Sequence, residues 1–195
     1  MTQIGLTDAM IKAVDLENDS KQHQTPATNP PMQKHEEASD FDETWRYRSL
    51  IGMLTYLARN TRLYIEYSLH QCARFQSNPK KPHANAVKKM VRYLLGTKDQ
   101  GVLFALNGEM DHFECFVDAD FAGNYTVETS EDPNSVKSRT GCVIKYAGCP
   151  ITWFSRLQTE IALSTTEAEY MALSLAAREV LPLRELVVEL KIYFK

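Results

Sequence analysis

Asp118 and Asp120 stand two residues apart at the end of an apolar stretch, and they are the residues of this chain best suited to bind a divalent metal ion. In an extended strand, side chains at positions i and i+2 point to the same face, so both carboxylates can reach one cation. Gly123 permits a tight turn directly afterwards. The alternative is a strand that runs into an acidic turn, because aspartate is favoured in turns without any metal.

A second acidic motif follows about 45 residues downstream, where 162–173 reads as a strand end followed by the start of a helix. Three residues are possible N-caps of this helix: Ser164, Thr165 and Thr166. Glu167 then suits a capping box and the positive end of the helix dipole, so it has a structural explanation.

Glu169 lacks such an explanation. Its neighbours at i+3, i+4 and i+7 are Ala172, Leu173 and Ala176, which places its carboxylate on the apolar face that must pack against a sheet. Burial of an unpaired charge is costly. A metal ion held jointly with Asp118 would remove that cost, and so would an arginine or lysine partner.

The order of strand, Asp-x-Asp, hairpin and Ser-Thr-Thr-Glu-Ala-Glu-Tyr helix resembles the ribonuclease H domain at the end of copia-type LTR-retrotransposon Pol polyproteins. Further segments carry the same resemblance: Ser138-Arg-Thr-Gly-Cys-Val-Ile144, Pro150-Ile-Thr-Trp-Phe-Ser-Arg-Leu-Gln158, and upstream 47–58 and 83–97, which resemble the end of the reverse-transcriptase region. Together the similar segments run from about Leu6 to Leu190.

The resemblance implies roles for the acidic residues. Asp118 corresponds to the first catalytic carboxylate and Glu169 to the second, while Asp120 is an alternative or auxiliary metal ligand. In the family such carboxylates hold two Mg²⁺ ions, which activate the attacking water and stabilise the leaving oxygen of the RNA strand in an RNA/DNA hybrid. The implied partners are that hybrid and the rest of the Pol polyprotein.

The family pattern also includes a third Asp on the strand after this helix and a fourth near the end of the domain. Neither occurs in the sequence up to Lys195, and no Asp-Asp pair of the reverse-transcriptase type occurs anywhere in it. We therefore expect a polyprotein fragment without polymerase chemistry, whose truncated ribonuclease H domain is inactive alone and has an unpaired strand edge. The alternative is a non-catalytic remnant, degenerate or domesticated, that binds nucleic acid or another partner. A third reading is an unrelated metal-binding α+β domain.

The pattern of elements predicts an α+β fold: an N-terminal helical segment followed by a partial ribonuclease H-like fold. We expect a partly disordered linker with a short N-terminal helix over 1–44, three helices of a connection segment over 45–100, and the truncated domain over 101–195. Strands are expected at 101–104, 113–118, 142–146 and 151–154. The final helix should run from Thr166 to about Ile192, kinked or split at Pro182.

Composition narrows the remaining classes. The 195 residues are 44% hydrophobic, enough to bury a core, and the net charge of −3 gives no overall basic surface for nucleic acid. A local basic cluster on one predicted helix reads as a solvated helix face or, alternatively, as a hybrid-binding surface: Lys80, Lys81, Lys88, Lys89 and Arg92. Trp153 reads as a core aromatic of the sheet, with base stacking as the alternative.

The cysteines and the apolar runs bear on where the chain works. Four cysteines without C-x-x-C spacing predict reduced, mostly buried thiols: Cys72, Cys115, Cys142 and Cys149. No run of 18 apolar residues occurs, so no membrane partner is expected. We therefore expect an intracellular location, either cytoplasmic or nuclear.

Overall fold

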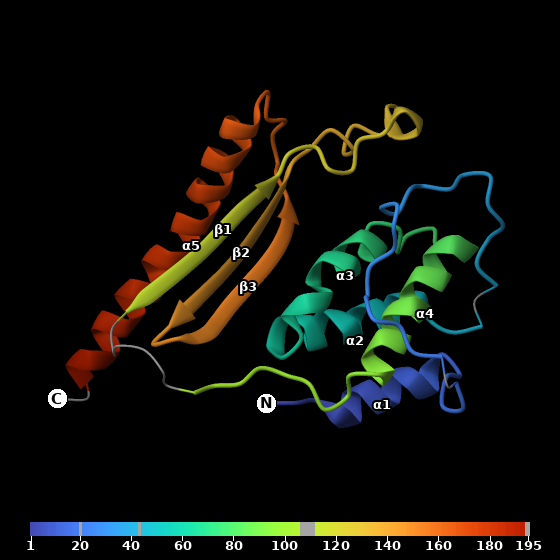
Figure 1. Cartoon of the computed structure of the whole chain (residues 1–195), viewed down its shortest axis with the longest axis horizontal. Helices are drawn as coiled ribbons and strands as arrows, with labels where there is room; N and C mark the ends of the chain where they lie inside the picture. The colour runs from blue at the N-terminus through green and yellow to red at the C-terminus, as the bar shows by residue number, and fades with distance from the viewer. Residues whose placement is uncertain (20, 43, 106–111, 194–195) are drawn as a thin grey trace. The chain divides into compact units, whose positions relative to one another are not determined.

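The computed structural model describes residues 1–19, 21–42, 44–105 and 112–193, and it divides the chain into two compact units, Met1–Val102 and Leu103–Lys195. Figure 1 shows a helical first unit and a second unit built on a sheet. This division falls two residues after the predicted boundary between 100 and 101. The finer division at residue 44 stays a prediction.

The first unit contains four α-helices within the described residues: α1 (Ile4–Ala13), α2 (Tyr47–Asn60), α3 (Glu66–Ala73) and α4 (Lys81–Leu95), with a short 3₁₀ turn, η1 (Leu63–Ile65), before α3. The last three confirm the helices expected before Gly96. Apolar residues at helical spacing form one core, in which Leu54, Leu57, Met90 and Leu94 are fully buried.

The segment between α1 and α2 packs against these helices. Leu16, Met32 and Phe41 are buried in the same core as α2 and α4. The basic cluster is neither a purely solvated face nor a free basic surface, because several of its members bind this segment. Three contacts do so: Lys80 Nζ to Asp40 Oδ1, Arg92 Nε to Asp19 Oδ2, and Lys89 Nζ to the carbonyl oxygen of Ala27.

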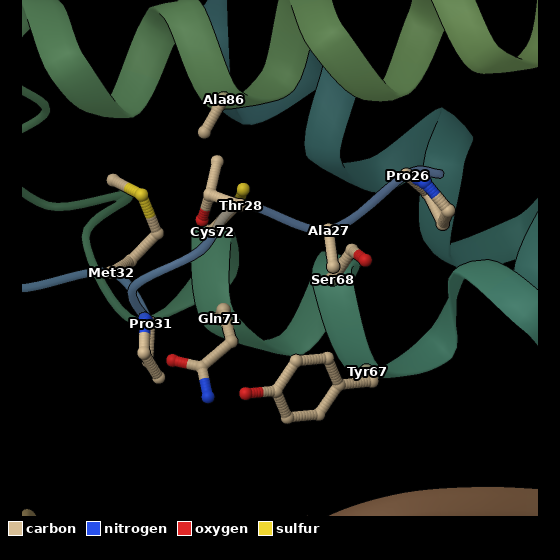
Figure 2. A pocket seen from close by; sticks show the side chains of 10 residues that line it. All are labelled: Pro26, Ala27, Thr28, Pro31, Met32, Tyr67, Ser68, Gln71, Cys72 and Ala86. Atoms are coloured by element: carbon tan, nitrogen blue, oxygen red, sulfur yellow. The ribbon is translucent and has the colours of Figure 1, made fainter. Parts of the chain in front are cut away.

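A small cavity lies where residues 26–32 cross α3 and α4 (Figure 2). Tyr67, Ser68 and Gln71 line it from α3, and Ala86 closes it from α4. Its volume is about 10 Å³, which is room for about one water molecule and far below the size of a cofactor pocket. This cavity is therefore a packing feature of the first unit.

The second unit is a three-stranded antiparallel sheet in the order β1-β2-β3, followed by a long helix. Its elements are β1 (Phe113–Asp120), a 3₁₀ turn η2 (Val127–Thr129), β2 (Arg139–Tyr146), β3 (Cys149–Leu157) and α5 (Thr165–Tyr193). The hairpin between β2 and β3 turns on Ala147 and Gly148, and both have positive φ, as a two-residue turn of this kind requires. This arrangement confirms the predicted α+β class with a partial ribonuclease H-like fold.

Helix α5 covers one face of the sheet, over β1 and β2 (Figure 1). Ala168, Ala172 and Ala176 recur every four residues and are buried, so small side chains let the helix approach the strands closely. The core of the unit consists of Cys142, Ile144, Phe154 and Ala176, with Phe113, Val117, Leu175, Val180 and Leu183 packed around them. The helix is not split at Pro182, because helix-favouring residues on both sides continue it.

The strand predicted over 101–104 is wrong. The backbone of Val102 exchanges two hydrogen bonds with Met1, one in each direction, and no β-strand forms there. A Cβ at Gly101 would lie 2.0 Å from the carbonyl oxygen of Met1, so only glycine at position 101 lets the two backbone segments come this close. Leu103 and Phe104 are exposed. The prediction assumed that an apolar run is buried in a sheet, and here it is not.

Among the described helices, none is both long enough and apolar enough to cross a membrane.

Candidate acidic site at the end of strand β1

Asp118 and Asp120 lie at the C-terminal end of β1, and both are exposed. Strand alternation puts them on one face, as predicted from their spacing. Val117 and Phe113 point to the other face, where they pack in the core beneath α5. The two aspartates therefore lie on the face of the sheet turned away from α5.

The start of α5 is fixed by a cap. The Ser164 side chain accepts a hydrogen bond from the Glu167 backbone N–H at 3.1 Å, and the Glu167 carboxylate accepts one from the Leu163 N–H at 2.7 Å. The first bond satisfies a backbone donor in the first turn that the helix itself cannot satisfy, and the second holds the residue just before the N-cap. The capping role predicted for Glu167 is confirmed, with Ser164 as the N-cap.

Glu169 lies one half-turn further along α5. Its Oε1 accepts a hydrogen bond from the backbone N–H of Ala119 at 3.3 Å, which brings its carboxylate to the segment between Asp118 and Asp120. The predicted burial of Glu169 is wrong, because its side chain is exposed. Helical spacing correctly placed it toward the sheet, but at the outer edge of β1, where water still reaches it.

Gly123 decides where the Asp120 carboxylate can lie, which the sequence alone did not indicate. A Cβ at Gly123 would stand 2.0 Å from Asp120 Oδ2, so the carboxylate folds over the bare Cα of this glycine. The preceding Ala122 has a positive φ of 48°, and its N–H lies 3.4 Å from the Ser138 hydroxyl as a donor. The turn after β1 therefore brings Gly123 against the Asp120 side chain.

Gln158 ties the strand ends to α5. Its Nε2 donates to Thr140 Oγ1 at 3.2 Å and to the carbonyl oxygen of Ala168 at 2.8 Å, and the side chain is only 6% exposed. Thr140 is the cross-strand partner of Ala119. Gln158 thus holds the first turn of α5 at the level of the acidic residues. In the sequence, Gln158 appears only as part of a Trp-x-Ser-x-x-Gln pattern, and this bridging role was not predicted.

The face of the sheet that carries Asp118 and Asp120 also carries aromatic and basic groups. Trp153 is 8% exposed, which confirms its prediction as a core aromatic. Phe116 is exposed and lies under the Lys145 ammonium group, whose nitrogen is 4.8 Å from the ring centroid. Arg139 stands opposite Asp120 in the register and is buried, with Nη1 3.5 Å from the Ser155 carbonyl oxygen.

The chemistry of these donors suits Mg²⁺, because carboxylate oxygens are its usual protein ligands. Their arrangement does not complete a site. Among the residues that the structure describes, no group of three His, Cys, Asp or Glu side chains is placed to hold a metal ion. Asp118 and Asp120 approach from one face of β1, and Glu169 approaches from the helix side across the edge. The assignment of the three as metal ligands stays a prediction.

Comparison with curated proteins relates most of the chain to retrotransposon proteins. The retrovirus-related Pol polyprotein from transposon TNT 1-94 of Nicotiana tabacum is 37% identical over 149 residues, which are 76% of this chain and 10% of that protein. The corresponding polyprotein from transposon RE2 of Arabidopsis thaliana is 33% identical over 166 residues, 85% of this chain and 11% of that protein. The chain belongs to the retrovirus-related Pol polyproteins of copia-type transposons. It spans about a tenth of the length of these Pol relatives.

A smaller relative is matched over most of its own length. Secreted RxLR effector protein 161 of Plasmopara viticola is 35% identical over 133 residues, which are 68% of this chain and 87% of that protein. No family model matches the sequence, and no solved structure matches the fold. The family assignment therefore rests on the polyproteins, and the residue-level chemistry rests on the geometry of the site.

Proposed function

We propose that the second unit is the ribonuclease H-like part of a copia-type Pol polyprotein and contributes to cleavage of the RNA strand in RNA/DNA hybrids. Asp118 and Glu169 serve as two of the carboxylates that hold Mg²⁺, and Asp120 is an auxiliary ligand. The observation that carries this proposal is the hydrogen bond from the Ala119 N–H to Glu169 Oε1, at 3.3 Å. It brings a carboxylate from α5 to the strand segment that holds both aspartates.

The surroundings of the site fit a polyanionic substrate. Phe116 shares the face of β1 that carries Asp118 and Asp120, and the Lys145 ammonium group lies over its ring. An exposed aromatic ring beside a cation suits contact with a nucleic-acid strand, because bases stack on such rings and phosphates attract the charge. Divalent metal at this edge would supply charge stabilisation for the scissile phosphate.

We expect the 195-residue chain to be inactive alone. Phosphodiester cleavage with two metal ions requires more oxygen ligands than Asp118 and Glu169 supply. The described residues gather no group of three acidic or other metal-binding side chains. The isolated chain should therefore bind a divalent ion weakly at this edge without turning over substrate.

The test has two arms. In the first, the purified chain and its Asp118→Asn variant are incubated with a labelled RNA/DNA hybrid and Mg²⁺. Equal absence of cleavage is the expected result, and cleavage lost in Asp118→Asn would show that the chain completes an active site unaided. Cleavage that persists undiminished in Asp118→Asn would place the activity elsewhere and refute the proposed site.

The second arm measures metal binding directly. Mn²⁺, which accepts the same oxygen ligands, is titrated while amide signals are followed by NMR. Broadening centred on residues 118–120 and 169 supports the site, and it should weaken in Asp118→Asn and in Glu169→Gln. The matched control is Glu160→Gln, because Glu160 is an exposed carboxylate outside the site. Broadening that is absent, or that is unchanged by both substitutions, contradicts the proposal.

A second candidate function is a non-catalytic module that keeps the fold and binds nucleic acid or a protein. Two observations favour it: the incomplete metal ligand set among the described residues, and the match to a protein named as an effector over 87% of that protein's length. Hybrid affinity without metal-dependent broadening would favour this candidate. Loss of that affinity in Lys145→Gln would locate the binding face on the sheet.

A further inference from the structure

Cys115 and Cys142 are neighbours on adjacent strands, and their sulfur atoms lie 3.8 Å apart. In the register of the sheet, Cys115 stands opposite Ile144, while Cys142 stands opposite Val117. The two cysteines are therefore diagonal neighbours on one face, the face that packs beneath α5. Their contact is made within the second unit and is separate from the acidic side chains.

The geometry leaves little movement before a bond could form. A disulfide needs a sulfur separation of about 2.0 Å, and Cys115 is exposed, so rotation of its side chain is not blocked by the core. The other two thiols have different surroundings. Cys72 is buried in the first unit, and Cys149 donates its thiol hydrogen to the carbonyl oxygen of Ala105 at 3.1 Å.

Exposure also sets the order of reaction. A thiolate is the attacking species in disulfide exchange, and it must reach the oxidant. Cys115 can meet a dissolved disulfide directly, whereas Cys142 is buried. Burial, together with the adjacent Cys115, raises the pKa of the Cys142 thiol to about 12. Cys142 is therefore suited to the second, intramolecular step, in which proximity offsets its small thiolate fraction.

We propose that Cys115 and Cys142 form a reversible disulfide when the chain meets a small disulfide such as oxidised glutathione. The Cys115 thiolate attacks one glutathione sulfur, the glutathione disulfide breaks, and one glutathione leaves and takes up a proton. Cys142 then loses its proton to water and attacks the Cys115 sulfur, and the second glutathione leaves. Two protein thiols are oxidised by two electrons in total, and one glutathione disulfide is reduced to two thiols.

The bond would fasten β1 to β2. Strand β1 is an outer strand of the sheet, held on one side by β2, and it carries Asp118 and Asp120. A cross-link at Cys115 therefore restricts fraying of the strand that positions these carboxylates. This consequence does not depend on whether the site cleaves RNA, because it follows from strand pairing alone.

Trypsin gives a clean test, because each cysteine falls on its own peptide. Cys115 lies in 99–137, Cys142 in 140–145, Cys149 in 146–156 and Cys72 in 63–74. The folded chain is incubated with oxidised glutathione, free thiols are blocked with N-ethylmaleimide, and the digest is analysed by mass spectrometry without reduction. The linked pair 99–137 with 140–145 should exceed linked pairs with Cys72 or Cys149 by about tenfold or more.

Variants separate proximity from general reactivity. Cys149→Ser should leave the linked pair unchanged, whereas Cys115→Ser and Cys142→Ala should each abolish it. Digestion after oxidation in urea, where strand register is lost, should yield a mixture of pairings. The proposal is overturned if Cys115 ends as a stable mixed disulfide with glutathione, if it links two copies of the chain, or if pairing in the folded chain is as mixed as in urea.

Discussion

Glu169 on α5 accepts a hydrogen bond from the backbone N–H of Ala119 on β1, with the nitrogen and oxygen 3.3 Å apart. Strand β1 is an outer strand of the described sheet, so a backbone donor that points away from β2 needs another acceptor or water. The carboxylate supplies that acceptor. Glu169, which is predicted to be a metal ligand, thus also accepts one backbone hydrogen bond at the open edge of β1, the strand that carries Asp118 and Asp120.

This contact predicts a local effect of substitution. Glu169→Ala removes the acceptor and should speed hydrogen exchange of the Ala119 amide by about twofold, since a long, exposed hydrogen bond contributes only about 0.5 kcal/mol. Glu169→Gln keeps a side-chain oxygen and should exchange like the native chain. Amide exchange measured by NMR decides the matter, and an unchanged Ala119 rate in Glu169→Ala would show that the bond does not persist in solution.

Gly123→Ala should displace the Asp120 carboxylate, because the new Cβ would lie 2.0 Å from Oδ2. The side chain can rotate away, so we expect a modest destabilisation of about 1 kcal/mol or less. In an Asp120→Ala background the obstacle is gone, and the loss of unfolded-state entropy on replacing glycine should make Gly123→Ala neutral or stabilising. Urea unfolding of the four proteins forms a double-mutant cycle, and purely additive effects would contradict the contact.

The sequence determined some of this site and not the rest, for physical reasons. The two-residue period of a strand places Asp118 and Asp120 on the same face wherever the strand packs, so that prediction was secure. A helical pattern gives only the sector of the helix on which Glu169 lies. Whether that sector meets the middle of the sheet or its edge depends on strand order, so the expected burial of Glu169 was wrong.

Long-range contacts account for the other differences. The segment before α2 looked like a linker because few of its residues are apolar. It is nevertheless tied to α4 by pairs such as Arg92 with Asp19 and Lys80 with Asp40, which are far apart in the sequence. Nothing local reveals such pairs. Likewise, Val102 in the predicted strand pairs with Met1 instead of a strand partner, and periodicity cannot identify the partner.

Gln158→Ala should lower the free energy of unfolding of the second unit by about 1–3 kcal/mol, because it removes a buried side chain that joins β2 to α5 and leaves buried groups of Thr140 and Ala168 without that donor. Urea unfolding followed by Trp153 fluorescence, in a Trp45→Phe background, reports on this unit. Glu160→Ala, nearby and exposed, should change stability by less than about 0.5 kcal/mol. Equal effects of the two substitutions would show that Gln158 does not join the two elements.

The first unit should lose stability in mild acid because of His83. Its Nδ1 accepts a hydrogen bond from the Lys80 N–H at 2.9 Å, and its Nε2 lies 2.8 Å from the Gln33 carbonyl oxygen, so a neutral ring with the proton on Nε2 satisfies both. A proton on Nδ1 would oppose the Lys80 N–H. Burial is the largest cause and lowers the pKa of His83. The Gln33 hydrogen bond raises it in part, and the neighbouring His35 and Lys80 lower it by smaller amounts.

The sign of the effect follows from that direction. At a pH below the ordinary histidine value of about 6.5 and above the lowered pKa of His83, the unfolded chain binds a proton that the folded chain does not. Stability is therefore complete above about pH 6.5 and falls as the pH drops toward the folded pKa, by up to about 1.4 kcal/mol per pH unit. Urea unfolding between pH 7.5 and 5, followed by Trp45 fluorescence in a Trp153→Phe background, measures the slope. His83→Gln should flatten it, and His112→Gln, an exposed histidine of the second unit, should not; a slope that survives His83→Gln would assign the acid sensitivity to another group.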